Sequence, residues 1–179
     1  VIRTNLNALN FRLVTAPIAG VADRATWRDL VAHRDDAFIH EFLTFKDFLA
    51  VEERSGALRK VRLKSWKDGN ESLVAADEPS YAMSFGTNEE QDTSQLRYVY
   101  ASLTTPNTTY DLDTATGERK LMKRDPVLGD FDPARYATEL LWAPARDGKR
   151  VPISLFYRRG TPRDGTAPLY ITGYGSYGF

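Results

Sequence analysis

The sequence predicts a mainly β protein that is built from repeated sets of short strands. Runs rich in β-branched and aromatic residues, separated by Gly, Pro, Asn, Asp and Ser, fill the first two thirds of the 179 residues. These runs fall into sets of four that recur about every 48 residues. A period of this length indicates an architecture in which one small sheet is repeated along the chain.

The first set keeps three strands and has no opening strand. We expect these strands at residues 1–5, 11–16 and 26–31. The chain begins like the middle of a strand, with neither a methionine nor a signal-peptide pattern. We therefore expect it to be an internal piece of a longer protein.

The second and third sets are complete. Turn residues at 46–47, 55–56 and 67–70 predict strands at 42–45, 48–53, 58–65 and 72–75. The third set is predicted at 81–85, 96–103, 108–113 and 118–123, with later turns at 105–107 and 114–117. The sets align Ile2 with Val51 and Val99, Leu13 with Leu63 and Leu112, and Leu30 with Leu73 and Leu121.

Four strands in each unit and a period near 48 residues predict the blades of a β-propeller. A propeller strand is covered by neighbouring blades on both faces, which explains why residues 98–103 do not alternate cleanly between apolar and polar. An antiparallel β-sandwich with an accidental repeat is the alternative fold.

The pattern changes at residues 125–133, where two prolines, one glycine and three aspartates predict a linker. Beyond it, Asp147 and Gly148 predict a hairpin between strands at 139–143 and 151–157. A third strand at 169–172 is expected to lead into the glycine-rich end, GYGSYGF.

This order of a hairpin, a strand and a glycine-rich loop fits an α/β-hydrolase, in which the loop after the third strand supplies part of the oxyanion hole. A tyrosine hydroxyl stays protonated at neutral pH and can donate to an oxyanion. A flexible tail or turn with tyrosines packed on a core is the alternative interpretation.

A catalytic serine or histidine is not evident in the sequence. Ser176 has Tyr174 two residues before it, and the nucleophile pattern Gly-x-Ser-x-Gly occurs nowhere. His33 and His40 have no positioned partner in the sequence, so we interpret both as ordinary residues of the blades.

The acidic residues are interpreted as structural. Asp111 and Asp113 share one strand face and could hold a cation, but a turn follows them, which favours solvated acids at a strand end. Glu52–Glu53 and Glu89–Glu90 are interpreted as charged edge or loop residues.

Composition excludes several classes. The 24 basic and 24 acidic residues cancel, so there is no electrostatic case for nucleic acid or an anionic membrane as a partner. Without cysteine, disulfides and thiolate metal sites are impossible. No apolar run approaches the length of about 20 residues that spans a bilayer. We expect no cofactor and no metal.

Several motifs occur in order along the chain. They are Ile2-Arg-Thr-Asn5, Asn10-Phe-Arg-Leu13, Val51-Glu-Glu-Arg54, Tyr98-Val-Tyr-Ala-Ser-Leu-Thr-Thr-Pro106, Thr116-Gly-Glu-Arg119, Gly129-Asp-Phe-Asp-Pro133, Ala143-Pro-Ala-Arg-Asp-Gly148, Val151-Pro-Ile-Ser-Leu-Phe-Tyr-Arg-Arg-Gly160 and Gly173-Tyr-Gly-Ser-Tyr-Gly178. Together they resemble the prolyl oligopeptidase family of serine peptidases, in particular its oligopeptidase B branch.

The resemblance implies a seven-bladed propeller that caps an α/β-hydrolase domain. Residues 1–124 would be the last blades, 125–133 the interdomain crossing and 134–179 the truncated start of the peptidase domain. Tyr174 falls on the family's oxyanion-hole tyrosine, and Tyr177 on an aromatic position beside the primary specificity pocket. The catalytic Ser, Asp and His would lie beyond residue 179, so the 179 residues alone are expected to be inactive.

The resemblance also implies an activity for the parent protein: a cytoplasmic enzyme that hydrolyses short basic peptides after Arg or Lys, with the propeller restricting substrate size. We expect the isolated piece to self-associate through open sheet edges. The alternatives are a kelch-like propeller that serves as a binding module, and another hydrolase, either a post-proline peptidase or an esterase.

Overall fold

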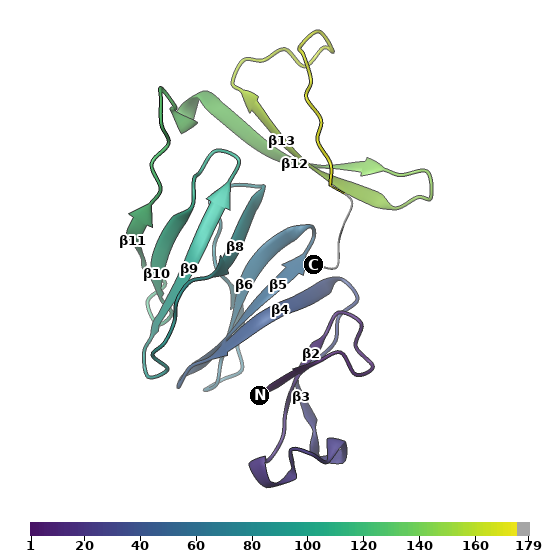
Figure 1. The fold of residues 1–179 in the computed structure, drawn as a ribbon, viewed down its shortest axis with the longest axis vertical. Coiled ribbons are helices and arrows are strands. Elements are labelled where there is room, and N and C mark those ends of the chain that lie inside the picture. Colours follow the sequence, from purple (N-terminus) through teal and green to yellow (C-terminus); the bar gives the residue numbers. More distant parts are fainter. Residues whose placement is uncertain (175–179) are drawn as a thin grey trace.

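Antiparallel strands make up nearly all of the regular structure (Figure 1). The computed structural model describes residues 1–174. Helical residues in this part form three short 3₁₀ turns, at Ile18–Gly20, Arg24–Thr26 and Pro133–Arg135. The predicted mainly β class is confirmed, and none of the sheets that the described residues form closes on itself.

The strands group into three units and a hairpin, in the order of the chain (Figure 1). Unit 1 contains β1 (Ile2–Thr4), β2 (Arg12–Thr15) and β3 (Arg28–Val31). Unit 2 contains β4 (Ala37–Thr44), β5 (Phe48–Ser55), β6 (Leu58–Ser65) and β7 (Glu71–Leu73). Unit 3 contains β8 (Tyr81–Phe85), β9 (Gln95–Ser102), β10 (Thr108–Asp113) and β11 (Arg119–Arg124). The hairpin is β12 (Tyr136–Pro144) and β13 (Arg150–Arg158).

Within each unit, strands that follow one another in the chain pair in antiparallel fashion. Units 2 and 3 are connected by one parallel residue pair, Arg59 with Ala82. This single pair joins them formally into one eight-stranded sheet. The sets of three, four and four strands predicted from the sequence are therefore confirmed.

β5 is buried on both faces, because units 1 and 3 pack against opposite sides of unit 2. Leu49 and Val51 belong to an apolar cluster with residues of unit 1. Phe48 and Ala50 belong to a second cluster, shared with unit 3. Successive side chains of a strand point to opposite faces, so residues 48–53 are all buried.

Turn chemistry explains the tight connections. Gly56 and Ala57 both have positive φ, 56° and 66°, as a two-residue type I′ hairpin requires between β5 and β6. In the β12–β13 hairpin only Gly148 has positive φ, 82°. The predicted hairpin at Asp147–Gly148 is confirmed, with glycine alone taking the left-handed conformation.

Two strand predictions are corrected. β4 begins at Ala37, five residues before the predicted start, because Ala37 and Ile39 are buried and continue the strand. Residues 169–172 were expected to form a strand but have no regular structure. Leu169 and Ile171 are 71% and 78% exposed, and no strand among residues 1–174 pairs with this segment.

Candidate functional site

Tyr174 is the predicted oxyanion donor that falls within the described residues. Its side chain is 75% exposed, at the end of the irregular segment that follows the hairpin. Tyr177, the predicted pocket wall, lies outside the described residues, as does Ser176. Among residues 1–174, no serine and histidine are brought together beside Tyr174 as a catalytic pair.

The hairpin that precedes this segment is held by charged side chains. Glu139 on β12 accepts a hydrogen bond from the Tyr157 hydroxyl on β13. It also pairs with Arg163, whose Nη1 lies 3.0 Å from Glu139 Oε1. These two bonds lower the pKa of Glu139 below its usual value. The Glu139 carboxylate thus ties the start of the segment after β13 to the hairpin.

A second carboxylate organises the end of unit 3 that faces the hairpin. Glu78, in the connection between units 2 and 3, accepts hydrogen bonds from Tyr100, Thr104 and Thr105. The Tyr100 and Thr105 hydroxyls each lie 2.9 Å from Glu78 Oε2. We call these four residues the Glu78 cluster. Burial alone would raise the pKa of Glu78, but the hydroxyl donors outweigh it and the pKa is lowered.

The same connection contacts the hairpin directly. The buried Ser80 hydroxyl, two residues after Glu78, donates to the Ser154 hydroxyl on β13 at 2.8 Å. In Figure 1 the β12–β13 hairpin lies across the end of unit 3. The Glu78 cluster therefore holds this connection to unit 3, and the serine pair joins the connection to the hairpin.

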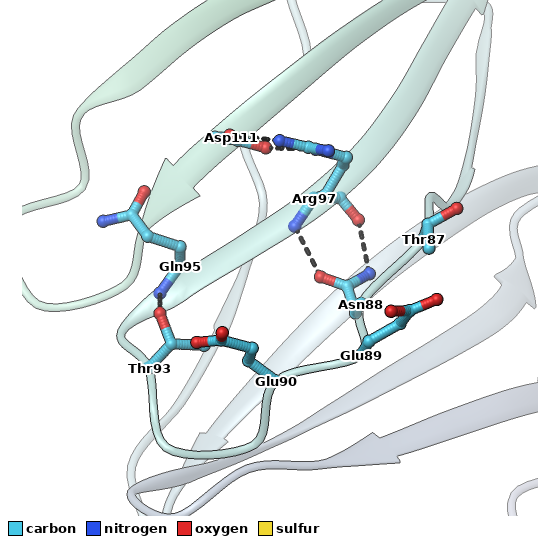
Figure 2. A pocket seen from close by; sticks show the side chains of 8 residues that line it. All are labelled: Thr87, Asn88, Glu89, Glu90, Thr93, Gln95, Arg97 and Asp111. Atoms are coloured by element: carbon cyan, nitrogen blue, oxygen red, sulfur yellow. Dashed lines mark hydrogen bonds and ion pairs between the residues drawn. The ribbon is translucent and has the colours of Figure 1, made fainter.

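A hollow of about 330 Å³ lies on the face of unit 3 that points away from unit 2 (Figure 2). Its lining residues are Thr87, Asn88, Glu89, Glu90, Thr93, Gln95, Arg97 and Asp111. The Asn88 amide hydrogen-bonds the backbone N and O of Arg97, at 2.8 and 2.9 Å. The Arg97 guanidinium pairs with Asp111 through two bonds of 2.7 and 2.8 Å. Because these groups are hydrogen-bonded or ion-paired with one another, they hold the loop after β8 in place and do not form a catalytic arrangement.

Asp113 and the two histidines have structural roles, as the sequence predicts, but Asp111 is not the solvated strand-end acid that was predicted, because its side chain is only 17% exposed. Asp111 pairs with Arg97, which lowers the pKa of Asp111. Asp113 accepts hydrogen bonds from the backbone N of residues 115 and 116, at 2.8 and 3.1 Å. His33 Nδ1 lies 3.8 Å from Asp35. His40 Nε2 accepts from Arg54 at 3.2 Å, and burial followed by the Arg54 charge lowers the pKa of His40.

The interpretation of Glu52 and Glu53 as edge or loop residues is wrong. Both lie within β5 and are 2% exposed. Glu52 pairs with Arg59 and Glu53 with Arg62, and both partners come from β6. The uninterrupted apolar run that precedes them on β5, residues 48–51, belongs to a strand buried on both faces and leads both carboxylates into the interfaces between units. That pattern, continued past Val51, is the signal that could have placed them.

No group of three or more His, Asp or Glu side chains that could hold a metal ion occurs within residues 1–174. Over the same range, no helix has the length and apolarity that crossing a bilayer requires.

Known proteins resemble the chain along nearly its whole length. Dipeptidyl aminopeptidase BI from Pseudoxanthomonas mexicana is 49% identical over 99% of the chain and 24% of the relative. Protease 2 from Moraxella lacunata is 33% identical over 99% of the chain and 25% of the relative. The solved structure of oligopeptidase B from Trypanosoma brucei with covalently bound antipain, in its closed form, matches 90% of the chain and 24% of its own, with 29% identity and a TM-score of 0.76.

The chain thus spans about a quarter of the length of the curated relatives that it matches. Residues 1–125 match the family described as prolyl oligopeptidase, N-terminal beta-propeller domain. Three units of repeated antiparallel strands agree with that description. The chain belongs to the prolyl oligopeptidase family, and most of it corresponds to the family's propeller domain.

Proposed function

We propose that the chain is part of a serine peptidase, and that it joins the last blades of a seven-bladed propeller to the start of an α/β-hydrolase domain. In this proposal, residues 1–124 are the blades, 125–133 the crossing and 134–179 the opening of the peptidase domain. The observation that carries it is the family match over residues 1–125. Relatives named as peptidases at 49% and 33% identity support the peptidase assignment.

Tyr174 would act in the parent enzyme as one donor of the oxyanion hole. A serine from the rest of the parent would attack the peptide carbonyl, a histidine would transfer the proton, and an aspartate would orient that histidine. The Tyr174 hydroxyl would donate to the negatively charged oxygen of the tetrahedral intermediate. Tyr177 would form a wall of the primary specificity pocket. No cofactor or metal enters this chemistry.

The proposed substrates are short peptides cleaved after Arg or Lys, with the propeller restricting their size. The names Protease 2 and oligopeptidase B, carried by a relative and by a solved structure, support an oligopeptidase. A second candidate is the removal of dipeptides from free N-termini, which the name of the 49% identical relative favours.

The experiment that tests the proposal compares substrates on the purified parent protein. Matched peptides with arginyl, lysyl or prolyl bonds, each with a free or a blocked N-terminus, are offered together with a simple ester. Cleavage after Arg and Lys in blocked peptides supports the oligopeptidase, and cleavage restricted to free N-termini supports the dipeptidyl peptidase. Cleavage after proline alone, hydrolysis of the ester alone, or no reaction with a serine-directed fluorophosphonate would contradict the proposal.

The proposal extends to the 179-residue chain alone and to its location. We propose that the parent is cytoplasmic, which cell fractionation tests. The chain by itself should show no labelling by the fluorophosphonate, because the sequence contains no Gly-x-Ser-x-Gly.

We also propose that the 179-residue chain self-associates, since β1 and β11 lie at sheet edges. Sedimentation that does not vary with concentration would contradict self-association.

A further inference from the structure

Two adjacent carboxylates on β5 lie in different interfaces. Glu52 and Glu53 are each 2% exposed, and a charged side chain is almost never buried to this degree unless it is paired. Because side chains alternate along a strand, Glu52 shares the face of Phe48 and Ala50, toward unit 3. Glu53 shares the face of Leu49 and Val51, toward unit 1.

Glu52 makes a hydrogen bond across the interface between units 2 and 3. The backbone N of Phe85, on β8, donates to Glu52 Oε2 at 3.0 Å. The other oxygen of the carboxylate pairs with Arg59 on β6. One carboxylate therefore connects a strand of unit 2 to the first strand of unit 3.

The Phe85 N–H uses the Glu52 carboxylate in place of an acceptor on a partner strand. Backbone groups of an antiparallel pair point alternately toward and away from the partner strand. Gly86 N points toward β9, where it donates to Arg97 O at 3.0 Å. Phe85 N, one residue earlier, therefore points to the opposite edge of β8. On that edge the strand-to-strand connection to unit 2 is the single pair Arg59 with Ala82.

We propose that Glu52 holds units 2 and 3 together by supplying the acceptor that a partner strand would otherwise give to Phe85. If the parent is the size-limited peptidase proposed above, on which this second step rests, the bond also limits how far the two units separate to admit larger peptides. Glu53 serves the other interface, where it pairs with Arg62 and lies 3.6 Å from Arg34 in the connection from unit 1.

The test is hydrogen exchange at the Phe85 amide in the full parent protein. Glu52→Gln keeps the shape of the side chain but has one acceptor oxygen in place of two; the charged Arg59 guanidinium competes for that oxygen, which leaves the donor NH2 group facing Phe85 N. We expect exchange at Phe85 to become at least about tenfold faster, the factor that corresponds to about 1.4 kcal/mol. Glu53→Gln is the matched control, because it makes the same change at the same burial on the neighbouring residue. It should leave exchange at Phe85 unchanged.

A second measurement on the same variants tests the consequence for substrates. The ratio of kcat/KM for a long peptide to that for a short peptide with the same cleaved bond should rise in Glu52→Gln and stay constant in Glu53→Gln. Equal exchange at Phe85 in both variants would overturn the role of Glu52. Faster exchange with an unchanged ratio would overturn the control of substrate size.

The two readouts also separate this inference from the proposed function. Hydrogen exchange needs no substrate, so it decides the role of Glu52 even if the parent cleaves no peptide. Should Glu52→Gln fail to fold, Glu52→Asp keeps the charge beside Arg59 and shortens the reach toward Phe85. Exchange at Phe85 as slow as in the unmodified protein would then overturn the inference.

Discussion

Removing the Tyr100 hydroxyl tests the Glu78 cluster. The Tyr100 side chain is 1% exposed, and its hydroxyl donates to the Glu78 carboxylate at 2.9 Å. Tyr100→Phe removes this donor and leaves the ring in the core. A hydrogen bond to a charged group contributes about 1.5–3 kcal/mol to stability. Thr104 and Thr105 still donate to Glu78 in this variant. We therefore expect the free energy of unfolding to fall by an amount at the lower end of this range, about 1.5 kcal/mol.

The loss should depend on pH in a defined direction. Burial alone would raise the pKa of Glu78, but hydrogen bonds from hydroxyls, including that of Tyr100, lower it below its usual value. A carboxyl group whose pKa is lower in the folded state stabilises that state above its unfolded pKa. This contribution disappears as the pH falls through the folded pKa. The cost of Tyr100→Phe should therefore be largest near neutral pH and shrink in acid.

Urea unfolding at neutral and at acidic pH measures this cost. Tyr81→Phe is the matched control, since Tyr81 stacks on Tyr100 at 5.8 Å and its hydroxyl makes no hydrogen bond within residues 1–174. A double-mutant cycle with Glu78→Gln isolates the pair, and the two changes should be less than additive. A cost below about 0.5 kcal/mol, the usual range of surface substitutions, would refute the reasoning.

Two further changes have expected outcomes. Leu96 is completely buried between units 2 and 3, so Leu96→Ala should lower the free energy of unfolding by about 2–5 kcal/mol; a denaturation midpoint equal to that of the unmodified protein would show that the two units do not pack through this residue. Asp111→Asn breaks an ion pair in which Arg97 is 41% exposed, so it should cost at most about 1 kcal/mol, with the effect reduced by salt in the same assay. A salt-independent loss of several kcal/mol would contradict that account.

Local turn chemistry made much of the fold predictable. The bounds of β6, β8 and β10 agree with the sequence prediction to the residue. Each is flanked by residues that favour turns, such as Gly56 and Gly117, both of which have positive φ. The turn signals therefore located the strand ends without any knowledge of the tertiary contacts.

The face of the sheet to which each side chain points was harder to predict than the position of the strands along the chain. The repeat aligns Val51 with Val99, and each does lie in the second strand of its unit, Val51 in β5 and Val99 in β9. However, Val51 faces the preceding unit, whereas on β9 that role belongs to Leu96 and Tyr98. Val99 points to the opposite face, because a shift of one residue reverses every side chain of a strand. The alignment of Val51 with Val99 is thus correct in spacing and wrong by one residue in register, whereas Leu13 and Leu63 are aligned correctly, since each faces the next unit.

The order of elements predicts the kind of candidate site, but the role of a particular residue in it rests on the resemblance. The resemblance of its motif predicts that Tyr174 is an oxyanion donor, whereas its 75% exposure does not by itself indicate a catalytic role. The segment at 169–172 was predicted as a strand from its composition, but a strand also needs a partner, which composition does not supply. Glu78 was missed because its donors lie 22 to 27 residues away in the sequence.

The central claim is that Tyr174 donates to the oxyanion in a serine peptidase. Tyr174→Phe in the intact parent, assayed on an arginyl amide substrate, tests it most directly. Loss of one oxyanion donor should lower kcat by about 10² to 10³, with the parent still labelled by a serine-directed fluorophosphonate. An unchanged kcat would contradict the claim.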